Sequence, residues 1–331
     1  MFSAIYIEEE IYSTPRVQNI LERYPTLPRI TIERYGEVFN RKAQNFRLQK
    51  LKPALILAKK YNKFVLPAPQ EYSIGEGDNY YFSHMLNCVY DCRYCFLQGM
   101  YRSANYVLFV NYDDFATGIQ QTAAAQPEKI NYFYSGYDCD SLVFEPLSRF
   151  ASYFLPLFKD IPNAVLELRT KSTQVRSLLD MEPIENCVVA FSFTPAIISQ
   201  ALEHKVPSIE KRIDAIKKLQ QKGWKVGLRF DPLIYDDNYI AYYGELFESV
   251  FKKINVDELH SVSMGVFRLP ETYFKNMAKL YPNEKLFAAK LDKQQGMVSY
   301  QQEIEQAMVQ HCEQALLSYV PKHKYFPCSL S

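Results

Sequence analysis

"NCVYDCRYCFLQ", residues 87–98, places three of the seven cysteines of the chain within eight positions. Cys88, Cys92 and Cys95 follow the spacing C-x3-C-x2-C, with aromatic residues between and after them. Three thiolates at this spacing suit an iron–sulfur cube held at three of its corners, because thiolates are the protein ligands of such clusters. The fourth iron then lacks a protein ligand and is free to accept a substrate.

Zinc and a metal-free loop are the competing interpretations. Zinc needs a fourth ligand, for which His84 or Cys139 is available, but its usual sites carry paired C-x2-C knuckles and this chain has one such pair. Three buried cysteines without a metal fit poorly with so polar a segment. A disulfide is disfavoured, because the acidic N-terminus "MFSAIYIEEEIYS" is unlike a signal peptide and predicts a cytoplasmic protein with reduced thiols.

The composition is that of a globular protein with a sizeable core. The chain has 331 residues, 48% of them hydrophobic, and a formal net charge of +1. That charge provides no global field to attract nucleic acid. No apolar run approaches the roughly 20 residues that span a bilayer, so we expect no membrane segment. A local basic cluster favours a solvated helix face over a phosphate-binding surface, and it consists of Arg41, Lys42, Arg47, Lys50 and Lys52.

The pattern of apolar runs predicts an α/β fold. After a boundary rich in proline and glycine at 66–78, six short apolar runs alternate with helical stretches: 80–86, 130–136, 164–170, 187–193, 225–234 and 259–269. The clearest helix spans 207–223, and we expect a last helix at roughly 299–319. Six strands alternating with helices predict parallel pairing with right-handed crossovers, as a partial barrel or as an open doubly wound sheet.

The cysteine motif, with Tyr94 before its last cysteine, resembles that of the radical S-adenosylmethionine superfamily. Later blocks narrow the resemblance to the spore photoproduct lyase family and its DNA photolyase-like relatives, over roughly 66–270: "CRYCFLQG", "SGYDCDSLVFEPL", "LRTKS", "AFSFTP" and the segment 207–234. The resemblance implies a partial (βα)6 barrel at 76–285, with the cluster loop after its first strand. A small N-terminal α/β extension at 1–75 and a C-terminal helix and tail at 286–331 would flank it.

The same resemblance implies the cofactors. A [4Fe-4S] cluster would be held by Cys88, Cys92 and Cys95, with S-adenosylmethionine bound to its open iron. An electron delivered by a reductant such as flavodoxin or ferredoxin would cleave S-adenosylmethionine to methionine and a 5′-deoxyadenosyl radical.

Carried over residue by residue, the resemblance also implies the cofactor pocket. Tyr94 would lie against the adenine edge, and Ser135 and Gly136 would meet the amino group of S-adenosylmethionine. Lys171 and Ser192 would reach its carboxylate or ribose. All of these except Tyr94 are expected at strand C-terminal ends, where barrels of this kind bind their ligands.

Two positions depart from the lyases of the family, which use a cysteine after the second strand to return a hydrogen atom. They also carry a tyrosine after the last cluster cysteine, where this chain has Phe96. Tyr137 and Cys139 are the candidates for the hydrogen donor.

Both departures bear on the reaction with the substrate and leave the expected cofactors unchanged. Damaged DNA is the candidate partner, bound by a basic rim from the 41–52 cluster or from Arg229 and Arg268. The alternatives are a radical enzyme acting on RNA, a nucleoside or a peptide, and a non-catalytic iron–sulfur protein. Lys171 and Ser192 argue against the last, since electron transfer needs no cofactor pocket.

Overall fold

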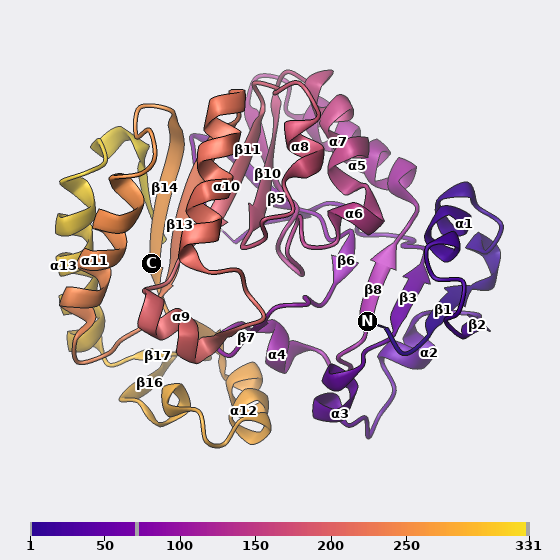
Figure 1. Cartoon of the computed structure of the whole chain (residues 1–331), viewed down its shortest axis with the longest axis horizontal. Coiled ribbons are helices and arrows are strands. Elements are labelled where there is room, and N and C mark those ends of the chain that lie inside the picture. The colour runs from indigo at the N-terminus through magenta and orange to yellow at the C-terminus, as the bar shows by residue number, and fades with distance from the viewer. Residues whose placement is uncertain (1, 70–72, 329–331) are drawn as a thin grey trace.

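Two sheets with separate apolar cores lie beside one another in the computed structural model, which describes residues 2–69 and 73–328 (Figure 1). The larger sheet has the order β18-β14-β13-β11-β10-β9-β5-β4. Six of its strands follow one another in chain order and pair in parallel: β5 (Gly77–Tyr81), β9 (Ile130–Tyr134), β10 (Ala164–Thr170), β11 (Cys187–Ser192), β13 (Lys225–Leu233) and β14 (Leu259–Val266). This curled sheet is the expected partial (βα)6 barrel.

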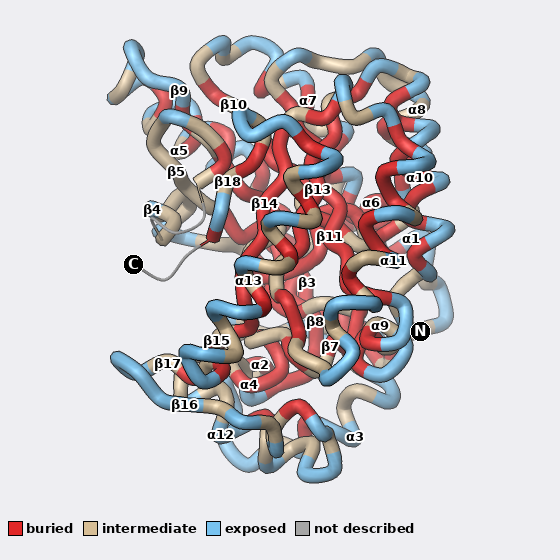
Figure 2. The backbone as a smooth tube through the Cα atoms, turned by 90° about the vertical axis from the view of Figure 1, so that its left-hand side faces the viewer, coloured by how far each residue is buried: buried red, intermediate tan, exposed pale blue. Residues whose placement is uncertain are grey.

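Two further strands extend the barrel sheet at its edges. β4 (Leu66–Pro67) pairs antiparallel with β5, and β18 (Tyr325–Cys328) adds a parallel strand beside β14. The central strands are buried along most of their length (Figure 2). Such nearly continuous apolar strands are typical of a parallel sheet that is covered on both faces.

Helices lie between the barrel strands along the chain, and several of them cover the outer face of the sheet (Figure 1). They are α5 (Tyr112–Ala125), α6 (Glu145–Ser148), α7 (Phe150–Lys159), α8 (Arg176–Leu179), α9 (Ala196–Leu202), α10 (Ile209–Lys222), α11 (Tyr239–Phe251) and α13 (Gln302–Leu317). In α10, Ser208 caps the first turn by accepting from the Lys211 amide, and Gly223 ends the helix at φ +99°. The predicted helices at 207–223 and 299–319 are thus confirmed within a few residues.

The smaller sheet has the order β2-β1-β3-β8-β6. Its strands are β1 (Ile5–Glu8), β2 (Arg29–Ile32), β3 (Leu55–Ala58), β6 (Met85–Leu86) and β8 (Tyr106–Phe109), with α1 (Pro15–Glu22), α2 (Gly36–Phe39) and α3 (Phe46–Leu51) around them. A division of the chain after residue 75 therefore separates three strands of this sheet from its last two. The prediction of a single strand at 80–86 is wrong. These residues span the end of β5 and all of β6, and the two strands belong to different sheets.

The C-terminal region is more elaborate than one helix and a tail. β15 (Arg268–Pro270), β16 (Leu291–Gln294) and β17 (Met297–Tyr300) form a small antiparallel sheet, and α12 (Glu271–Leu280) lies between its first two strands in sequence. No helix in the described ranges is long and apolar enough to span a bilayer.

Candidate cofactor and active site

The cysteine loop leaves the smaller sheet at β6 and turns under the barrel. Asn87 adopts a left-handed φ of +70°, which asparagine tolerates better than most residues, and its side chain donates to the Ser103 and Asn105 carbonyls at 2.8 and 2.7 Å. Next come β7 (Asp91–Cys92) and α4 (Leu97–Met100). The Asn87 turn thereby directs the following residues into the cavity at the barrel's end.

All three motif cysteines line this one cavity, which has about 1240 Å³ of space free of protein atoms, part of it open to solvent. None of Cys88, Cys92 and Cys95 forms a disulfide. Burial raises the pKa of each thiol above its ordinary value. Three thiols in one cavity, one from a buried cysteine and two from half-buried ones, fit a group that binds thiolates and offsets their charge, as an iron–sulfur cluster does.

The alternative zinc site loses one of its proposed ligands. The His84 ring is buried and stacks on Phe150 with centroids 3.9 Å apart, and His84 is not among the residues that line the cavity. Within the part of the chain that the structure describes, no three His, Cys, Asp or Glu side chains converge on a single metal ion. A cluster places one iron at each thiolate, so its cysteines need not converge in this way.

A buried carboxylate supports the cysteine loop from below. Glu203 lies on β12 (Glu203–His204), which pairs with β7 so that Glu203 faces Cys92. One of its oxygens accepts from Tyr94 Oη, and the other accepts from Ser199 Oγ at 2.7 Å and Arg212 Nη2 at 2.9 Å. Burial works to raise the pKa of the Glu203 carboxyl, but the nearby cations outweigh it, so that the pKa is lowered.

Lys171 brings a positive charge into the same cavity. Its ammonium lies 3.9 Å from Glu203 Oε1 and 5.6 Å from the centre of the Tyr94 ring. Its side chain is 15% exposed and lines the cavity wall. Since 3.9 Å is longer than a hydrogen bond, the ammonium keeps donors for an incoming anionic group.

Asp140 orders the loop that follows β9. Its oxygens accept from the Leu142 and Val143 amides at 3.0 and 2.9 Å, from Thr170 Oγ1 at 2.7 Å and from the Lys171 amide at 2.6 Å. One side chain therefore fixes both this loop and the strand end that carries Lys171. Asp140 also lines the cavity.

Ser135 and Gly136 have different environments. Gly136 lines the cavity, and a Cβ at this position would meet Arg169 O and Ser141 Oγ at 2.8 Å. The Ser135 hydroxyl is fully buried, does not line the cavity and pairs with Ser141 Oγ at 2.8 Å. Ser192 does line the cavity, and its carbonyl accepts from Arg212 Nη1 at 2.7 Å.

Tyr137 and Cys139, the candidate hydrogen donors, both line the cavity. The Tyr137 ring stacks on Tyr81 with centroids 4.3 Å apart and lies 5.6 Å from the Phe96 ring. The Cys139 thiol is buried and lies 3.8 Å from Ser135 O. Burial raises its pKa well above the ordinary value, so it is a thiol that carries a hydrogen atom.

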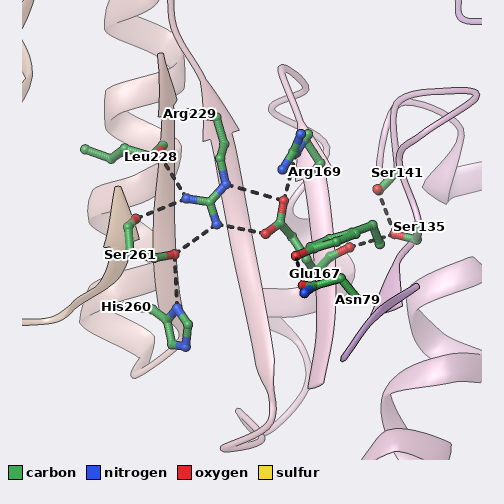
Figure 3. Close-up of polar contacts among 10 residues, drawn as sticks. Asn79, Ser135, Ser141, Glu167, Arg169, Leu228, Arg229, His260 and Ser261 are labelled. Carbon is green, nitrogen blue, oxygen red and sulfur yellow. Dashed lines mark hydrogen bonds and ion pairs between the residues drawn. The ribbon is translucent and has the colours of Figure 1, made fainter. Parts of the chain in front are cut away.

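A second buried ion pair forms the floor of the barrel (Figure 3). Glu167 Oε2 meets Arg229 Nη2 at 2.8 Å, and Glu167 Oε1 meets Arg169 Nε at 2.8 Å. Arg229 also donates to Ser261 Oγ at 2.9 Å. The expectation of Arg229 on a DNA-binding rim is therefore wrong, because its side chain is about 1% exposed and paired inside the barrel. Arg268 lines the cavity with 6% of its side chain exposed.

The groups that hold the site in place are not marked by any motif in the sequence. Glu203 and Arg212 come from a short strand and the first turn of a helix, and nothing in the local pattern marks either as buried. Arginine and glutamate side chains usually face solvent, so the residue types give no sign that these two are buried. Asp140 belongs to the "CDSL" block. Its position shortly after a strand is the sequence feature that could have indicated a side chain that orders the following loop.

Comparisons with known proteins agree with one another. The spore photoproduct lyase family model matches residues 71–326. The spore photoproduct lyase of Clostridium acetobutylicum is 23% identical over 209 residues, 63% of this chain and 62% of that protein. That of Bacillus subtilis is 22% identical over 250 residues, 72% of each chain. The matched regions span 62% of the length of the Clostridium and Geobacillus relatives, so less than two thirds of each is covered.

Solved structures share the whole fold. A double mutant of spore photoproduct lyase with bound AdoMet and dinucleoside spore photoproduct has a TM-score of 0.87 and 17% identity, covering 100% of this chain and 99% of that one. Another, spore photoproduct lyase complexed with dinucleoside spore photoproduct, has a TM-score of 0.85 at 17% identity with the same coverage. At this identity the likeness establishes the architecture.

Proposed function

The chain belongs to the spore photoproduct lyase family, and from that premise we propose that it is a radical S-adenosylmethionine enzyme that acts on thymine lesions in DNA. One observation carries the proposal: the three free thiols of the cysteine motif and the ammonium of Lys171 line a single cavity at the C-terminal end of a partial parallel barrel. Structures of its relatives contain AdoMet and a dinucleoside spore photoproduct, which supports the same cofactor and substrate class here.

The residues divide into those that hold the cofactors and those that support them. Cys88, Cys92 and Cys95 would hold a [4Fe-4S] cluster as thiolates, and Lys171 would bind the carboxylate of S-adenosylmethionine by a charge-assisted contact. When bound, the two groups together supply a carbon radical that removes one hydrogen atom from the substrate. Glu203 lies 3.9 Å from the Lys171 ammonium and accepts a hydrogen bond from Tyr94, which orients the aromatic ring in the cavity wall.

Hydrogen return is assigned to the loop after β9. Cys139 carries a protonated thiol beside the cavity, and it would give its hydrogen atom to the repaired base. Phe96 has no hydroxyl, but the Tyr137 ring lies 5.6 Å from it and belongs to the same wall. We therefore assign to Tyr137 the phenol that relatives carry after their last cluster cysteine.

The test is anaerobic reconstitution with iron and sulfide, followed by reduction with dithionite. We expect formation of 5′-deoxyadenosine from S-adenosylmethionine, and conversion of dinucleoside spore photoproduct to two thymidine units. Cys139→Ala should still cleave S-adenosylmethionine while losing clean repair. A colourless protein after reconstitution, or a coloured one that leaves S-adenosylmethionine intact, contradicts the proposal.

A second candidate is the same radical chemistry on RNA, a nucleoside or a peptide. The net charge of +1 and the burial of Arg229 favour the nucleoside and the peptide among these, because both reduce the basic surface available to a nucleic-acid backbone. The two candidates separate in the same assay. Cleavage of S-adenosylmethionine without any repair of the dinucleoside, and no binding of DNA at low salt, favours the second.

A further inference from the structure

The helix α3 carries the most exposed large apolar side chains in the described ranges. Leu51 is 81% exposed and Leu48 is 64% exposed, while the next, Ile240, is at 54%. Residues three and four apart share a helix face, so Leu51 lies beside Leu48 and Arg47, and Lys52 follows directly after the last helical residue. We call these four residues the α3 face. Figure 2 shows α3 at the foot of the molecule, where much of the chain is exposed.

The α3 face has a surplus of positive charge. Within the described part of the chain, neither Arg47 nor Lys52 forms an ion pair with a carboxylate, although pairs are found elsewhere on the surface. Lys205 is exposed and lies near enough to Lys50 to act on it electrostatically. Apolar side chains ringed by arginine and lysine are typical of a protein-binding surface that prefers an acidic partner.

The opposite side of α3 is bonded to the cysteine loop. Lys50 Nζ donates to Asp91 Oδ1 and Gln98 Oε1, and it lies 3.4 Å from Tyr281 Oη. Asp91 precedes Cys92 in the chain, and the Gln98 amide donates to the Cys95 carbonyl at 3.0 Å. A connected path of hydrogen bonds and covalent bonds therefore leads from α3 to two of the three cluster cysteines.

Further contacts make this connection rigid. The Arg93 guanidinium lies 3.2 Å from Asp91 and 3.6 Å from Glu284, and it stacks on the Tyr281 ring at 3.8 Å. Tyr281 Oη donates to Gln98 Oε1 at 3.0 Å. The loop is thus held between the smaller sheet's α3 and the C-terminal region, and the residues of the α3 face are exposed to solvent.

We propose that the α3 face is the docking surface for an acidic electron-transfer protein, a low-potential flavoprotein or iron–sulfur protein. The inference rests on the proposed function, which needs one electron at the cluster. In that step the reduced donor loses one electron and the cluster gains it, with no bond formed or broken. No residue of the α3 face lines the substrate cavity, so donor and substrate can bind at the same time.

Nucleic acid is the rival occupant, and the leucines decide against it. Contacts to a phosphate backbone come from arginine, lysine, polar side chains and backbone amides, and they gain nothing from two solvent-exposed leucines. A protein interface, by contrast, buries apolar side chains at its centre and leaves charges at its rim. The α3 face has the same arrangement on a small scale, with two exposed leucines next to two exposed cationic side chains.

The test uses the reconstituted holoenzyme with an acidic flavodoxin and an acidic ferredoxin as probes. The variant is Arg47→Glu/Leu51→Asp, and the matched control is Lys217→Glu/Ile240→Asp, which makes the same kinds of change on α10 and α11. We expect the affinity for at least one probe, measured by calorimetry at low salt, to fall at least tenfold in the variant and to stay unchanged in the control. Cleavage of S-adenosylmethionine driven by that probe should fall in parallel, while cleavage driven by dithionite should not.

The outcomes separate the docking proposal from the proposed function. Wild-type affinity of the variant for both probes, or no binding of either probe by the wild type, overturns the docking surface. A variant that loses DNA binding or self-association instead identifies another occupant and also overturns it. Failure of dithionite-driven cleavage in the wild type contradicts the proposed function, whereas the binding titration still decides the docking surface.

Discussion

Two buried carboxylates, Glu203 under the cysteine loop and Glu167 on the barrel floor, have the same kind of primary partner, a buried arginine, but different surroundings. Each pairs with a buried arginine, Glu203 with Arg212 at 2.9 Å and Glu167 with Arg229 at 2.8 Å. The other partner of Glu167 is Arg169, which also lines the cavity, and Arg169 and Arg229 together satisfy both carboxylate oxygens. The other partners of Glu203 include Tyr94, whose ring lines the cavity.

The difference lies in what each pair holds in place. Glu167 and Arg229 join β10 to β13 across β11, so they fix the curvature of the barrel. Glu203 and Arg212 join the cysteine loop to α10, and Arg212 also holds the Ser192 carbonyl. We therefore expect changes at Glu167 to reduce stability and changes around Glu203 to reduce cofactor binding. The following predictions test that division, beginning with the largest effect.

The division fails at once if the loop beside Glu203 holds no cluster. Cys92 faces Glu203 in the β7–β12 pair, and Cys92→Ala removes one of three thiolate ligands. We expect iron to fall from about four per chain to nearly none, with loss of the brown colour and of S-adenosylmethionine cleavage. Cys187→Ala, which changes a buried thiol at the start of β11, should keep both. A full iron complement in Cys92→Ala contradicts the assignment.

Breaking the Glu167–Arg229 ion pair should give the largest effect on stability. Glu167→Gln leaves Arg229 and Arg169 without their carboxylate in a buried site, and breaking such a pair costs about 3–5 kcal/mol. Urea unfolding of the apoprotein measures this free energy. The folded fraction should bind S-adenosylmethionine after reconstitution as the wild type does. A loss of affinity at unchanged stability would exchange the roles of the two carboxylates.

The contribution of the Glu167–Arg229 pair to stability should also depend on pH. Burial works to raise the pKa of Glu167, but Arg169 and Arg229 hold it at about 2, below the ordinary value of about 4.3. A depressed pKa contributes stability that is fully present above the ordinary value and is lost as the pH falls toward 2. The wild type should therefore lose stability more steeply than Glu167→Gln between about pH 4.5 and 2. Equal slopes would show that the pair does not titrate in this way.

Lys171 should affect the cofactor alone. Its ammonium is the charged donor in the cavity wall above Glu203, and a hydrogen bond to a charged group typically contributes about 1.5–3 kcal/mol. Lys171→Ala should weaken S-adenosylmethionine binding to the reconstituted protein by that amount, measured by calorimetry. Lys222→Ala, at a surface ion pair with Glu182, serves as the control and should bind normally. Unchanged affinity in Lys171→Ala would return this lysine to a structural role.

The cysteine motif is visible in the sequence, and the order of the barrel strands could be predicted from it, because both depend on local spacing. Alternation of apolar runs and helices is enough to predict parallel pairing, and the helix at 207–223 carried its own cap and end signals. Long-range pairings left no such trace. In the smaller sheet, β3 pairs with β8, which follows the cysteine loop in the chain. Arg229 lies near a strand end, which predicts a place on the rim, but its side chain is buried. Whether a charge is buried depends on partners from distant strands, which the local sequence does not encode.

The smallest effect is also the most direct comparison of the two carboxylate sites. Ser199 Oγ donates to Glu203 at 2.7 Å, and Ser261 Oγ accepts from Arg229 at 2.9 Å, so each pair has one serine at its side. Removing either hydroxyl deletes one hydrogen bond, which is worth about 1 kcal/mol. Ser199→Ala should appear as roughly a fivefold weaker binding of S-adenosylmethionine, because Glu203 then holds Lys171 and Tyr94 less firmly. Ser261→Ala should appear as a lower free energy of unfolding in urea, with cofactor affinity unchanged. If both variants lower stability equally and neither changes affinity, the two buried pairs have the same structural role, and Glu203 has no special part in cofactor binding.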